Sequence, residues 1–283
     1  MSSRETNLNF DEIGYWSEIK LDIIKDYAQA YSVIFNAPSQ RRFQHLYIDA
    51  FAGAGIHISK STGAFVPGSP LNALHVQPPF REYHFIDLDS KKIAHLKREA
   101  KNRADVYPYE GNCNSILLQK VFPRAKYEDY KRALCLLDPY GLHLDWRVIE
   151  TAGYMGSIDM FLNFPIADMN RNVLWRNPEA KGIRKTDIGR MNSFWGDESW
   201  RHIAYATNRN LFGFPEKEEN ETVASAFQER LKAKAQFKYV PTPLPMRNTR
   251  GAIIYYLFFA SQKPVASNIV DEIFERYRQT GIG

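Results

Sequence analysis

Short apolar runs alternate with helical patterns through the first part of this sequence. Each run leads into a turn-forming segment, and the stretches between them place apolar residues at helical spacing. The five runs lie in residues 46–50 and 83–87 and in the segments DVYPY, RALCLL and SIDMFLNF. Strands separated by helices at this cadence form right-handed βαβ units, so the pattern predicts a parallel, doubly wound α/β sheet.

The last third of the chain departs from this rhythm. After the helical stretch TVASAFQERLKAKAQ, the strand-like segments FKYVPTPLP and GAIIYYLFFAS are separated only by MRNTR. Two strands joined by so short a turn pair antiparallel. A final helix, ASNIVDEIFERYR, and an N-terminal helix over residues 11–36, with Asp11 as its cap, complete the expected elements. The prediction is a mostly parallel seven-stranded sheet that ends in an antiparallel C-terminal hairpin.

Composition limits both the size of the core and the kind of partner. The 283 residues, 44% of them hydrophobic, suffice for one main core with an added lobe. A net charge of +5 and a pI near 9.0 favour a polyanionic partner. The only cysteines, Cys113 and Cys135, argue against a disulfide framework or a cysteine-based zinc site, and we expect no metal. We expect a cytoplasmic protein without a membrane partner, because no stretch resembles a signal peptide or a membrane span.

The first strand leads into the glycine turn DAFAGAG, which has the composition of a ligand-binding loop. Gly53 and Gly55 let the backbone approach a ligand where a side chain would clash. Asp49 is placed to accept a hydrogen bond from an ammonium group, and Phe51 lies in the same turn. Position 58 is isoleucine, so the dinucleotide fingerprint GxGxxG fails, and thirteen residues separate the turn from the next helix. This spacing favours a ligand without phosphates over NAD.

Polar residues follow the next two strands at the same edge of the expected sheet. In an open α/β sheet, ligands bind beyond the carboxyl ends of the strands. Asp87, or Asp89 in its place, can accept hydrogen bonds from both hydroxyls of a ribose, because a carboxylate has two acceptor oxygens. Asn112 can accept a hydrogen bond from an adenine amino group through its carboxamide oxygen. The alternative for this third segment is a helix N-cap at Asn114.

The fourth strand ends in the step Asp-Pro-Tyr-Gly, at residues 138–141. One interpretation is turn chemistry, because Asp, Pro and Gly are all common in turns. The other is catalysis on the exocyclic amino group of a base, whose nitrogen lone pair is delocalised into the ring. If Asp138 through its carboxylate and Pro139 through its carbonyl accept the two N–H groups, that lone pair becomes localised, and Tyr140 can stack on the ring.

Five segments together, YIDAFAGAG, GSPLNAL, FIDLD, LLDPYGLHLDW and IDMFLNFP, resemble the three-Cys-motif partner proteins, and the likeness spans nearly the whole chain. The resemblance implies a Rossmann-like methyltransferase fold with a helical insertion and S-adenosylmethionine as the cofactor. It also implies a partner protein that carries a three-cysteine motif. Lys20 lies where a lysine of the wider group reaches the cofactor carboxylate, and the alternative is a solvated surface lysine.

The Asp-Pro-Tyr-Gly step is also similar to the Asp/Asn-Pro-Pro-aromatic motif of amino-directed nucleic-acid methyltransferases. The sequence departs from that motif, because Tyr140 replaces the second proline and Gly141 replaces the aromatic residue. Its sequence is more similar to the Asp-Pro-Phe-Gly of certain tRNA guanine amino-methylating enzymes. The likeness implies a nucleic-acid substrate, DNA or RNA, whose base carries the methyl-accepting amino group.

About fifty residues, 166–215, separate the fifth strand from the following helix, which exceeds an ordinary connection. The segment between positions 169 and 209 contains eight Lys or Arg residues and four Asp or Glu residues. Three of the five tryptophans also lie there. Cations interleaved with aromatic residues suit phosphate contacts and base stacking. The alternative is a small helical subdomain whose tryptophans pack inward. The candidate substrate-binding residues are Trp175, Arg176, Arg184 and Lys185.

The expected organisation is an N-terminal helical segment (residues 1–40), a methyltransferase core (41–165 and 216–283) and a basic helical lobe (166–215) that recognises the target. The leading hypothesis is an S-adenosylmethionine-dependent methyltransferase that acts on an exocyclic amino group of a nucleic-acid base. Two alternatives stay open. One is a cofactor-binding partner subunit of a three-cysteine-motif radical or metal enzyme, with little catalysis of its own. The other is a methyltransferase for small molecules or proteins.

Overall fold

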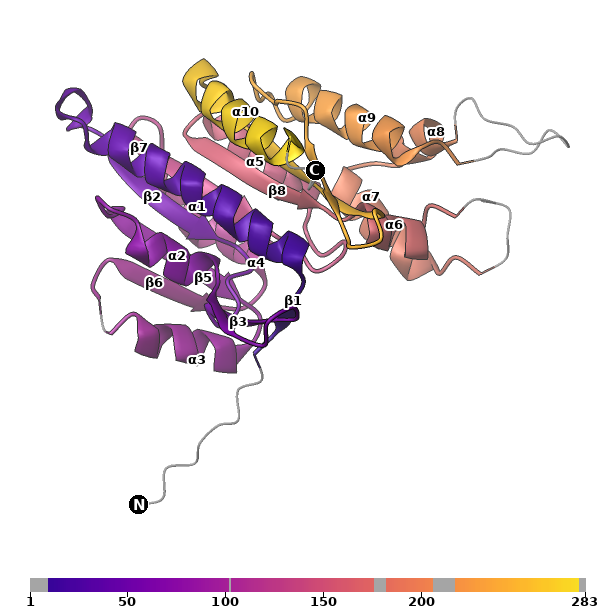
Figure 1. Cartoon of the computed structure of the whole chain (residues 1–283). Coiled ribbons are helices and arrows are strands. Elements are labelled where there is room, and N and C mark those ends of the chain that lie inside the picture. Colours follow the sequence, from indigo (N-terminus) through magenta and orange to yellow (C-terminus); the bar gives the residue numbers. More distant parts are fainter. Residues whose placement is uncertain (1–9, 102, 176–181, 206–216, 280–283) are drawn as a thin grey trace, which may run out of the picture. The chain divides into compact units, whose positions relative to one another are not determined.

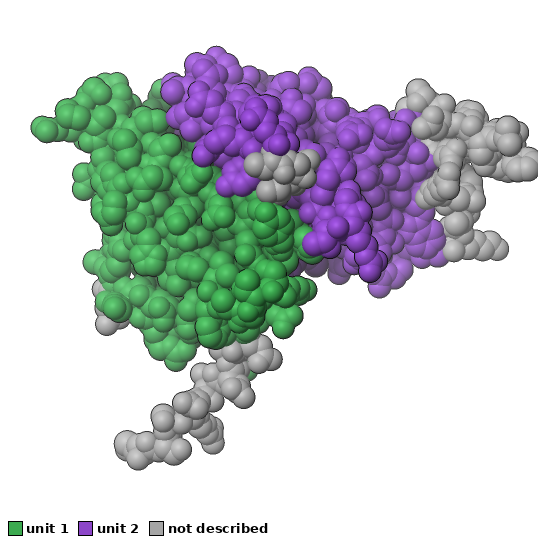
Figure 2. All heavy atoms as spheres, in the orientation of Figure 1, with its two compact units in different colours: residues 1–137 green, residues 138–283 purple. Residues whose placement is uncertain are grey.

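The structure of the chain is a computed structural model that describes residues 10–101, 103–175, 182–205 and 217–279. Figure 1 shows its helices and strands. The chain divides into two compact units, Met1–Leu137 and Asp138–Gly283, which Figure 2 shows in different colours. The division falls directly after β7 (Lys131–Leu137), so Asp138 is the first residue of the second unit.

Seven strands form one sheet in the order β6-β5-β2-β7-β8-β10-β9. β2 pairs parallel with β5 and β7, β5 pairs parallel with β6, and β10 pairs antiparallel with β8 and β9. This arrangement confirms the predicted Rossmann-like methyltransferase fold, a mostly parallel sheet that ends in an antiparallel hairpin. Besides β7, the strands are β2 (Gln44–Asp49), β5 (Glu82–Asp87), β6 (Val106–Glu110), β8 (Ile158–Phe164), β9 (Leu244–Arg247) and β10 (Ile253–Ala260).

Unit 1 contains a long N-terminal helix and shorter helices between its strands. The helix α1 (Tyr15–Asn36) buries one face that includes Ile23 and Tyr27, as the apolar spacing predicts. The predicted cap at Asp11 is wrong: Gly14 is the N-cap, and the Asp11 carboxylate pairs with Lys92, whose Nζ lies 2.6 Å from Oδ2. The other helical segments are η1 (Pro38–Gln40), α2 (Ser69–His75), α3 (Ser90–Glu99), α4 (Cys113–Ile116), the π-helical η2 (Leu117–Val121) and η3 (Phe122–Arg124).

A small second sheet, which the sequence analysis did not predict, joins a strand that precedes α1 to a hairpin in the connection between β2 and α2. It has the order β1-β3-β4, with β1 (Glu12–Ile13), β3 (Ile56–Ser59) and β4 (Phe65–Pro67). The hairpin β3–β4 brings the chain back to the glycine turn, since Gly68 N donates to Gly55 O at 2.7 Å. A Cβ on Gly68 would lie 2.9 Å from His57 Nε2, so a side chain there would force a shift. Helix α2 therefore begins beside the glycine turn despite the long connection.

Unit 2 is built around an aromatic core. The Phe227 ring lies 4.6 Å from the Phe164 ring and 5.7 Å from the Phe194 ring, measured between centroids. Trp195 and Trp200 are buried as well, which confirms for these two residues that the lobe tryptophans pack inward. In the described part of the chain its helices are α5 (Trp146–Met155), α6 (Ile166–Asn172), α7 (Lys185–Trp195), α8 (Trp200–Ala204), α9 (Asn220–Ala233) and α10 (Pro264–Gln279).

Both cysteines, Cys113 and Cys135, are buried thiols that form no disulfide. Burial, followed by the charge of Asp49, raises the pKa of Cys135 far above its ordinary value. Its thiol is therefore protonated and acts as an apolar core group. Across the described ranges, no helix combines the length and the apolar character that crossing a membrane requires.

Candidate functional site

Three predicted site residues of unit 1 follow strands at one edge of the sheet. In the parallel pairing, Asp49 lies opposite Phe85, and Asp87 lies opposite Glu110. Asn112 follows the end of β6 by two residues. Because parallel strands end at the same edge, the fold gathers the carboxyl ends of β2, β5 and β6, where a ligand of an open α/β sheet binds.

The Asp87 carboxylate is the most firmly oriented group at this edge. Its Oδ2 accepts from Gly53 N at 2.8 Å, and its Oδ1 accepts from Asp89 N at 2.8 Å. A carboxylate has about four acceptor directions, so Asp87 can bind two hydroxyls while it holds these two N–H groups. Asp89, the alternative candidate, instead caps α3 by accepting from Lys91 N at 2.8 Å.

Leu88, between these two acids, is a residue that the sequence analysis missed. Its side chain is 76% exposed, which is unusual for a leucine directly after a buried strand. If Asp87 binds a ribose as predicted, the neighbouring apolar side chain of Leu88 offers a surface on which a flat base can pack. The signal in the sequence was a lone leucine between two acids at a strand end.

The two glycines of the turn have different surroundings. Both have positive φ angles, +64° at Gly53 and +81° at Gly55. A Cβ on Gly55 would lie 2.9 Å from Leu96 Cδ2, so the missing side chain makes room for the core of the protein. A Cβ on Gly53 would meet only His57, at 3.9 Å, so the space beside Gly53 remains open to a ligand.

Unit 1 also buries two charged residues that were predicted to bind the ligand, Asp49 and Lys20. Asp49 is completely buried, and its Oδ1 accepts from Phe51 N at 3.2 Å, while Phe51 itself is partly exposed. Burial and then the Asp49 charge raise the pKa of Tyr47 well above its ordinary value. Lys20 on α1 is only 6% exposed, so the alternative of a solvated surface lysine is wrong. An ammonium group buried in this unit is a candidate partner for an anionic ligand group.

Asn112 has a structural task in addition to the predicted one. Its side-chain oxygen accepts from Asn114 N at 2.9 Å and from Ser115 N at 3.3 Å, and Asn112 is thereby the N-cap of α4. The alternative of a helix cap is therefore correct in kind, with Asn112 rather than Asn114 as the capping residue. The contact with an adenine amino group stays a prediction.

In unit 2, the Asp138 carboxylate follows β7 directly and is held by a side chain. Its Oδ1 accepts from Asn163 Nδ2 at 2.7 Å. Asn163 lies on β8 and is nine-tenths buried, and its Oδ1 has no hydrogen-bond partner among the described residues. Pro139 is buried, whereas Tyr140 is 62% exposed. The sequence analysis missed Asn163, although an asparagine inside the apolar run MFLNF was a signal.

The step at residues 138–141 leads into a turn, with a bend at Tyr140 and the turn itself at Gly141 and Leu142, which agrees with the turn-chemistry interpretation. The catalytic interpretation stays a prediction. Gly141 has a φ of +57°, which favours glycine. A Cβ at this position would lie only 2.6 Å from Asp168 Oδ2 on α6. The turn therefore meets the Asp168 side chain of α6 at a position where any added side chain would have a strained φ angle and would require the Asp168 carboxylate to shift.

The candidate substrate-binding residues of the lobe differ in their surroundings. Arg184 and Lys185 are exposed at the start of α7. Trp175 is partly exposed, and its Nε1 donates to Arg171 O at 3.0 Å. Arg176 lies outside the described residues.

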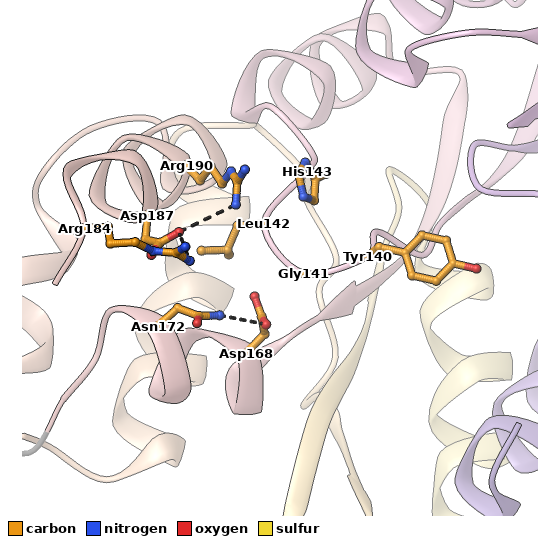
Figure 3. Close-up of a pocket in the computed structure, with 9 residues that line it drawn as sticks. All are labelled: Tyr140, Gly141, Leu142, His143, Asp168, Asn172, Arg184, Asp187 and Arg190. Atoms are coloured by element: carbon orange, nitrogen blue, oxygen red, sulfur yellow. Dashed lines mark hydrogen bonds and ion pairs between the residues drawn. The ribbon is translucent and has the colours of Figure 1, made fainter. Parts of the chain in front are cut away.

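A pocket of about 210 Å³ lies where the turn after β7 meets α6 and the start of α7. Figure 3 shows Asp168, Arg184 and Arg190 around this hollow, while the Tyr140 ring points away from it. Carboxylates and guanidinium groups thus line one small space within unit 2. The lining residues are Tyr140, Gly141, Leu142, His143, Asp168, Asn172, Arg184, Asp187 and Arg190.

No protein-family model matches the sequence, and no curated protein matches it. Among solved structures, the chain is similar to protein LPL1258 of Legionella pneumophila strain Philadelphia 1, from the DUF519 family, with 12% identity and a TM-score of 0.51. That similarity covers 93% of this chain and 92% of the other, and it supports the fold over nearly the whole length.

Two weaker similarities are to candidate methyltransferases. One, from Listeria monocytogenes, has 12% identity and a TM-score of 0.42, with 83% of this chain and 98% of that chain covered. The other, from Thermobifida fusca YX, has 11% identity and a TM-score of 0.41, with 86% and 82% covered. The chain thus shares its α/β fold with the Legionella protein, and the two weaker similarities add no argument to it.

Proposed function

We propose that this chain is an S-adenosylmethionine-dependent methyltransferase that methylates an exocyclic amino group of a nucleic-acid base. The observation that carries the proposal is Asp138, which follows a central parallel strand with its carboxylate oriented by Asn163. A carboxylate at the end of such a strand lies where the ligands of open α/β sheets bind.

The residues of unit 1 fit the cofactor. Asp87, fixed by two backbone N–H groups, is placed to accept from the ribose hydroxyls, and the open side of Gly53 allows close approach of the main chain. The buried Lys20 offers an ammonium group to the cofactor carboxylate, and Asp49 offers an acceptor to its amino group. When bound, the cofactor supplies an electrophilic methyl group on a sulfonium centre.

Unit 2 provides the groups that activate the acceptor nitrogen. Asp138 accepts one N–H of the amino group, and the Pro139 carbonyl accepts the other, so the nitrogen lone pair is withdrawn from conjugation with the ring. The Asn163 N–H donates to Oδ1 and keeps the carboxylate turned in one direction. When the N–CH₃ bond forms and the S–CH₃ bond breaks, the nitrogen gives up one proton, which the Asp138 carboxylate can take.

Two further features favour a nucleic-acid substrate. Tyr140, two residues after Asp138, is exposed, and an exposed aromatic ring can stack on a base for about 1–3 kcal/mol. The lobe presents exposed cations, including Arg184, Lys185 and Arg190, that suit phosphate groups. The lobe of residues 166–215 is therefore the proposed target-recognition element.

The proposal is tested by incubating the protein with cofactor that carries a radiolabelled methyl group and with separate pools of tRNA, ribosomal RNA and single-stranded DNA. Label is expected in one pool, on the amino nitrogen of a nucleoside after digestion, and it should be lost with Asp138→Ala. Label on protein or on small molecules would contradict the nucleic-acid target. Tight cofactor binding without label in any pool would favour the partner-subunit alternative.

A further inference from the structure

The pocket in the lobe contains two arginines that share one buried carboxylate. Asp187 accepts from Arg184 Nε at 2.7 Å and from Arg184 Nη2 at 3.3 Å. Arg190 Nη1 lies 3.6 Å from Asp187 Oδ1, which is an ion pair at longer range. The side chains of Arg184 and Arg190 are 69% and 51% exposed, whereas the Asp187 side chain is 7% exposed. Two cations against one anion leave a net positive charge at this wall, and Asp187 holds both guanidinium groups in place.

The opposite wall of the pocket carries an acidic side chain rather than basic ones. Asp168 on α6 is oriented by Asn172, whose Nδ2 donates to Oδ1 at 2.9 Å. The buried Leu142 contributes an apolar surface to the same hollow. Figure 3 shows Asp168 below the hollow, with Arg184, Asp187 and Arg190 on its other side. The pocket therefore presents donors on one wall, an acceptor on another and an apolar side chain between them.

The size of the pocket limits what it can hold. Its volume of about 210 Å³ is several times the roughly 30 Å³ that one water takes up in the liquid. A lone anion would leave most of that space empty. A flat heterocycle with an attached phosphate matches both the volume and the separation of charges, because arginine binds phosphate in a forked geometry and a carboxylate accepts from ring N–H groups.

The turn at residues 138–141 separates this hollow from the Tyr140 ring, which points away from it in Figure 3. Tyr140 and Gly141 are adjacent in sequence. If the target base of a nucleic acid stacks on Tyr140, the neighbouring nucleotide of that nucleic acid therefore lies close to the pocket. We propose that the lobe pocket binds this neighbouring nucleotide, with its phosphate on Arg184 and Arg190 and its base N–H on Asp168. This inference rests on the proposed function, because it names the part of a nucleic acid that the lobe holds.

Fluorescence anisotropy with a fluorescein-labelled single-stranded decanucleotide, in RNA and DNA forms, measures the phosphate contacts. Arg184→Gln and Arg190→Gln should each lower the slope of log affinity against log salt by about 0.7, which corresponds to about fivefold weaker binding at 0.1 M salt. Arg147→Gln, which removes an exposed cation of α5 outside the pocket, is the matched control. Pocket variants that behave like this control would overturn the proposal.

Asp168→Ala gives a second test, because a base contact and a purely electrostatic surface predict changes in nucleic-acid affinity of opposite direction. Removing a carboxylate that only repels phosphates strengthens nucleic-acid binding, whereas removing a base acceptor weakens it. We expect binding about 20-fold weaker with the wild-type salt slope, within the range for one lost hydrogen bond to a charged group. Tighter binding by Asp168→Ala overturns the assignment of Asp168.

The same measurements separate a failure of the pocket from a failure of the proposed function. If the wild-type chain binds and methylates nucleic acid but the pocket variants match Arg147→Gln, only the pocket assignment falls. If the wild-type chain binds S-adenosylmethionine but neither decanucleotide, the nucleic-acid target falls and the pocket assignment falls with it.

Discussion

The two units hold their polar site residues in different ways. In unit 1, Asp87 accepts from two main-chain N–H groups, and Asn112 accepts from two more. In unit 2, Asp138, Asp168 and Asp187 each accept from the side chain of another residue. The donors of unit 1 belong to the backbone of a glycine turn and of helix starts, whereas these side-chain donors of unit 2 can each be changed by a point mutation.

This difference matches the two ligands of the proposed reaction. Main-chain donors stay in place whatever the side chains become, and they suit a cofactor whose structure never varies. Side-chain donors can be exchanged one at a time, and they suit an acceptor that differs from one methyltransferase to another. Unit 1 should therefore tolerate few changes in its ligand, and unit 2 should be the part in which substrate preference changes.

The largest effect is expected from a change of Asp138, which should impair methyl transfer in unit 2 and leave cofactor binding by unit 1 intact. Asp138→Ala should lower the rate of methyl transfer by about 10³-fold, because one hydrogen-bond acceptor of the reacting amino group is lost. The dissociation constant for S-adenosylmethionine, measured by calorimetry, should stay within a few-fold. Glu229→Ala, an exposed acid on α9, serves as the control. Retained turnover would exclude Asp138 from catalysis.

The next effect concerns the stability of unit 1 in acid. Burial, and then Arg81, lowers the pKa of His45 to about 4 from an ordinary value of 6.5. Its Nε2 faces the Asn36 Nδ2 donor at 3.1 Å, so the folded protein holds the neutral ring. The unfolded chain takes up this proton first, so stability is complete above pH 6.5 and falls by at most about 3 kcal/mol as the pH drops to 4.

Hydrogen exchange at several pH values can locate this loss. His84 in unit 1 is also buried with a lowered pKa, chiefly through burial, whereas His143 and His202 of unit 2 are exposed. Amides of unit 1 should therefore lose protection between pH 6.5 and 4 before those of unit 2. His45→Gln should flatten this dependence. Equal acid sensitivity in both units would remove this contrast between them.

A smaller effect is expected for cofactor affinity at Asp87. Asp87→Ala should weaken binding of S-adenosylmethionine by about 100-fold, since it removes acceptors for the ligand and for the Gly53 N–H group. Asp87→Asn should be nearly as damaging, because one oxygen of the pair becomes a donor that faces a backbone N–H group. The control is Asp89→Ala, which should cost about 1 kcal/mol of stability through loss of the α3 cap. Wild-type affinity for S-adenosylmethionine in Asp87→Asn would show that cofactor binding does not depend on the charge of this side chain.

The smallest effect tests whether a side chain holds the acceptor carboxylate. Asn163→Ala and Asn163→Leu should both lower kcat by about tenfold, because the hydrogen bond to Asp138 is lost. Affinities for cofactor and nucleic acid should not change. If Leu restores the rate and Ala does not, Asn163 acts by filling space rather than by orienting Asp138.

The sequence predicted the sheet well because a parallel strand needs a continuous apolar run, and each run sits between helical patterns. The polar residues that end such strands, among them Asp49, Asp87 and Asp138, were therefore visible as candidates. Their partners were less visible. Asn163 lies inside an apolar run, and its importance depends on β8 ending beside the turn that begins at Asp138.

Other features depend on contacts between segments that are distant in sequence. The hairpin β3–β4 consists of very short strands, and its closure rests on Gly68 meeting Gly55. The pocket joins three segments, the turn after β7, α6 and α7, and no local pattern relates Gly141 to Asp168. The boundaries of the lobe and the contacts of its residues with a substrate remain predictions.

The contact between position 141 and Asp168 has an evolutionary consequence. Because a methyl group at position 141 would lie 2.6 Å from Asp168 Oδ2, a substitution there requires the Asp168 side chain to shift, and we expect the two positions to vary together. Homologous chains with a bulkier residue in place of Gly141 should carry a shorter one at position 168, and those that keep the acid should keep the glycine. An alignment in which the two columns vary without correlation would show that this loop and its neighbouring helix have drifted apart.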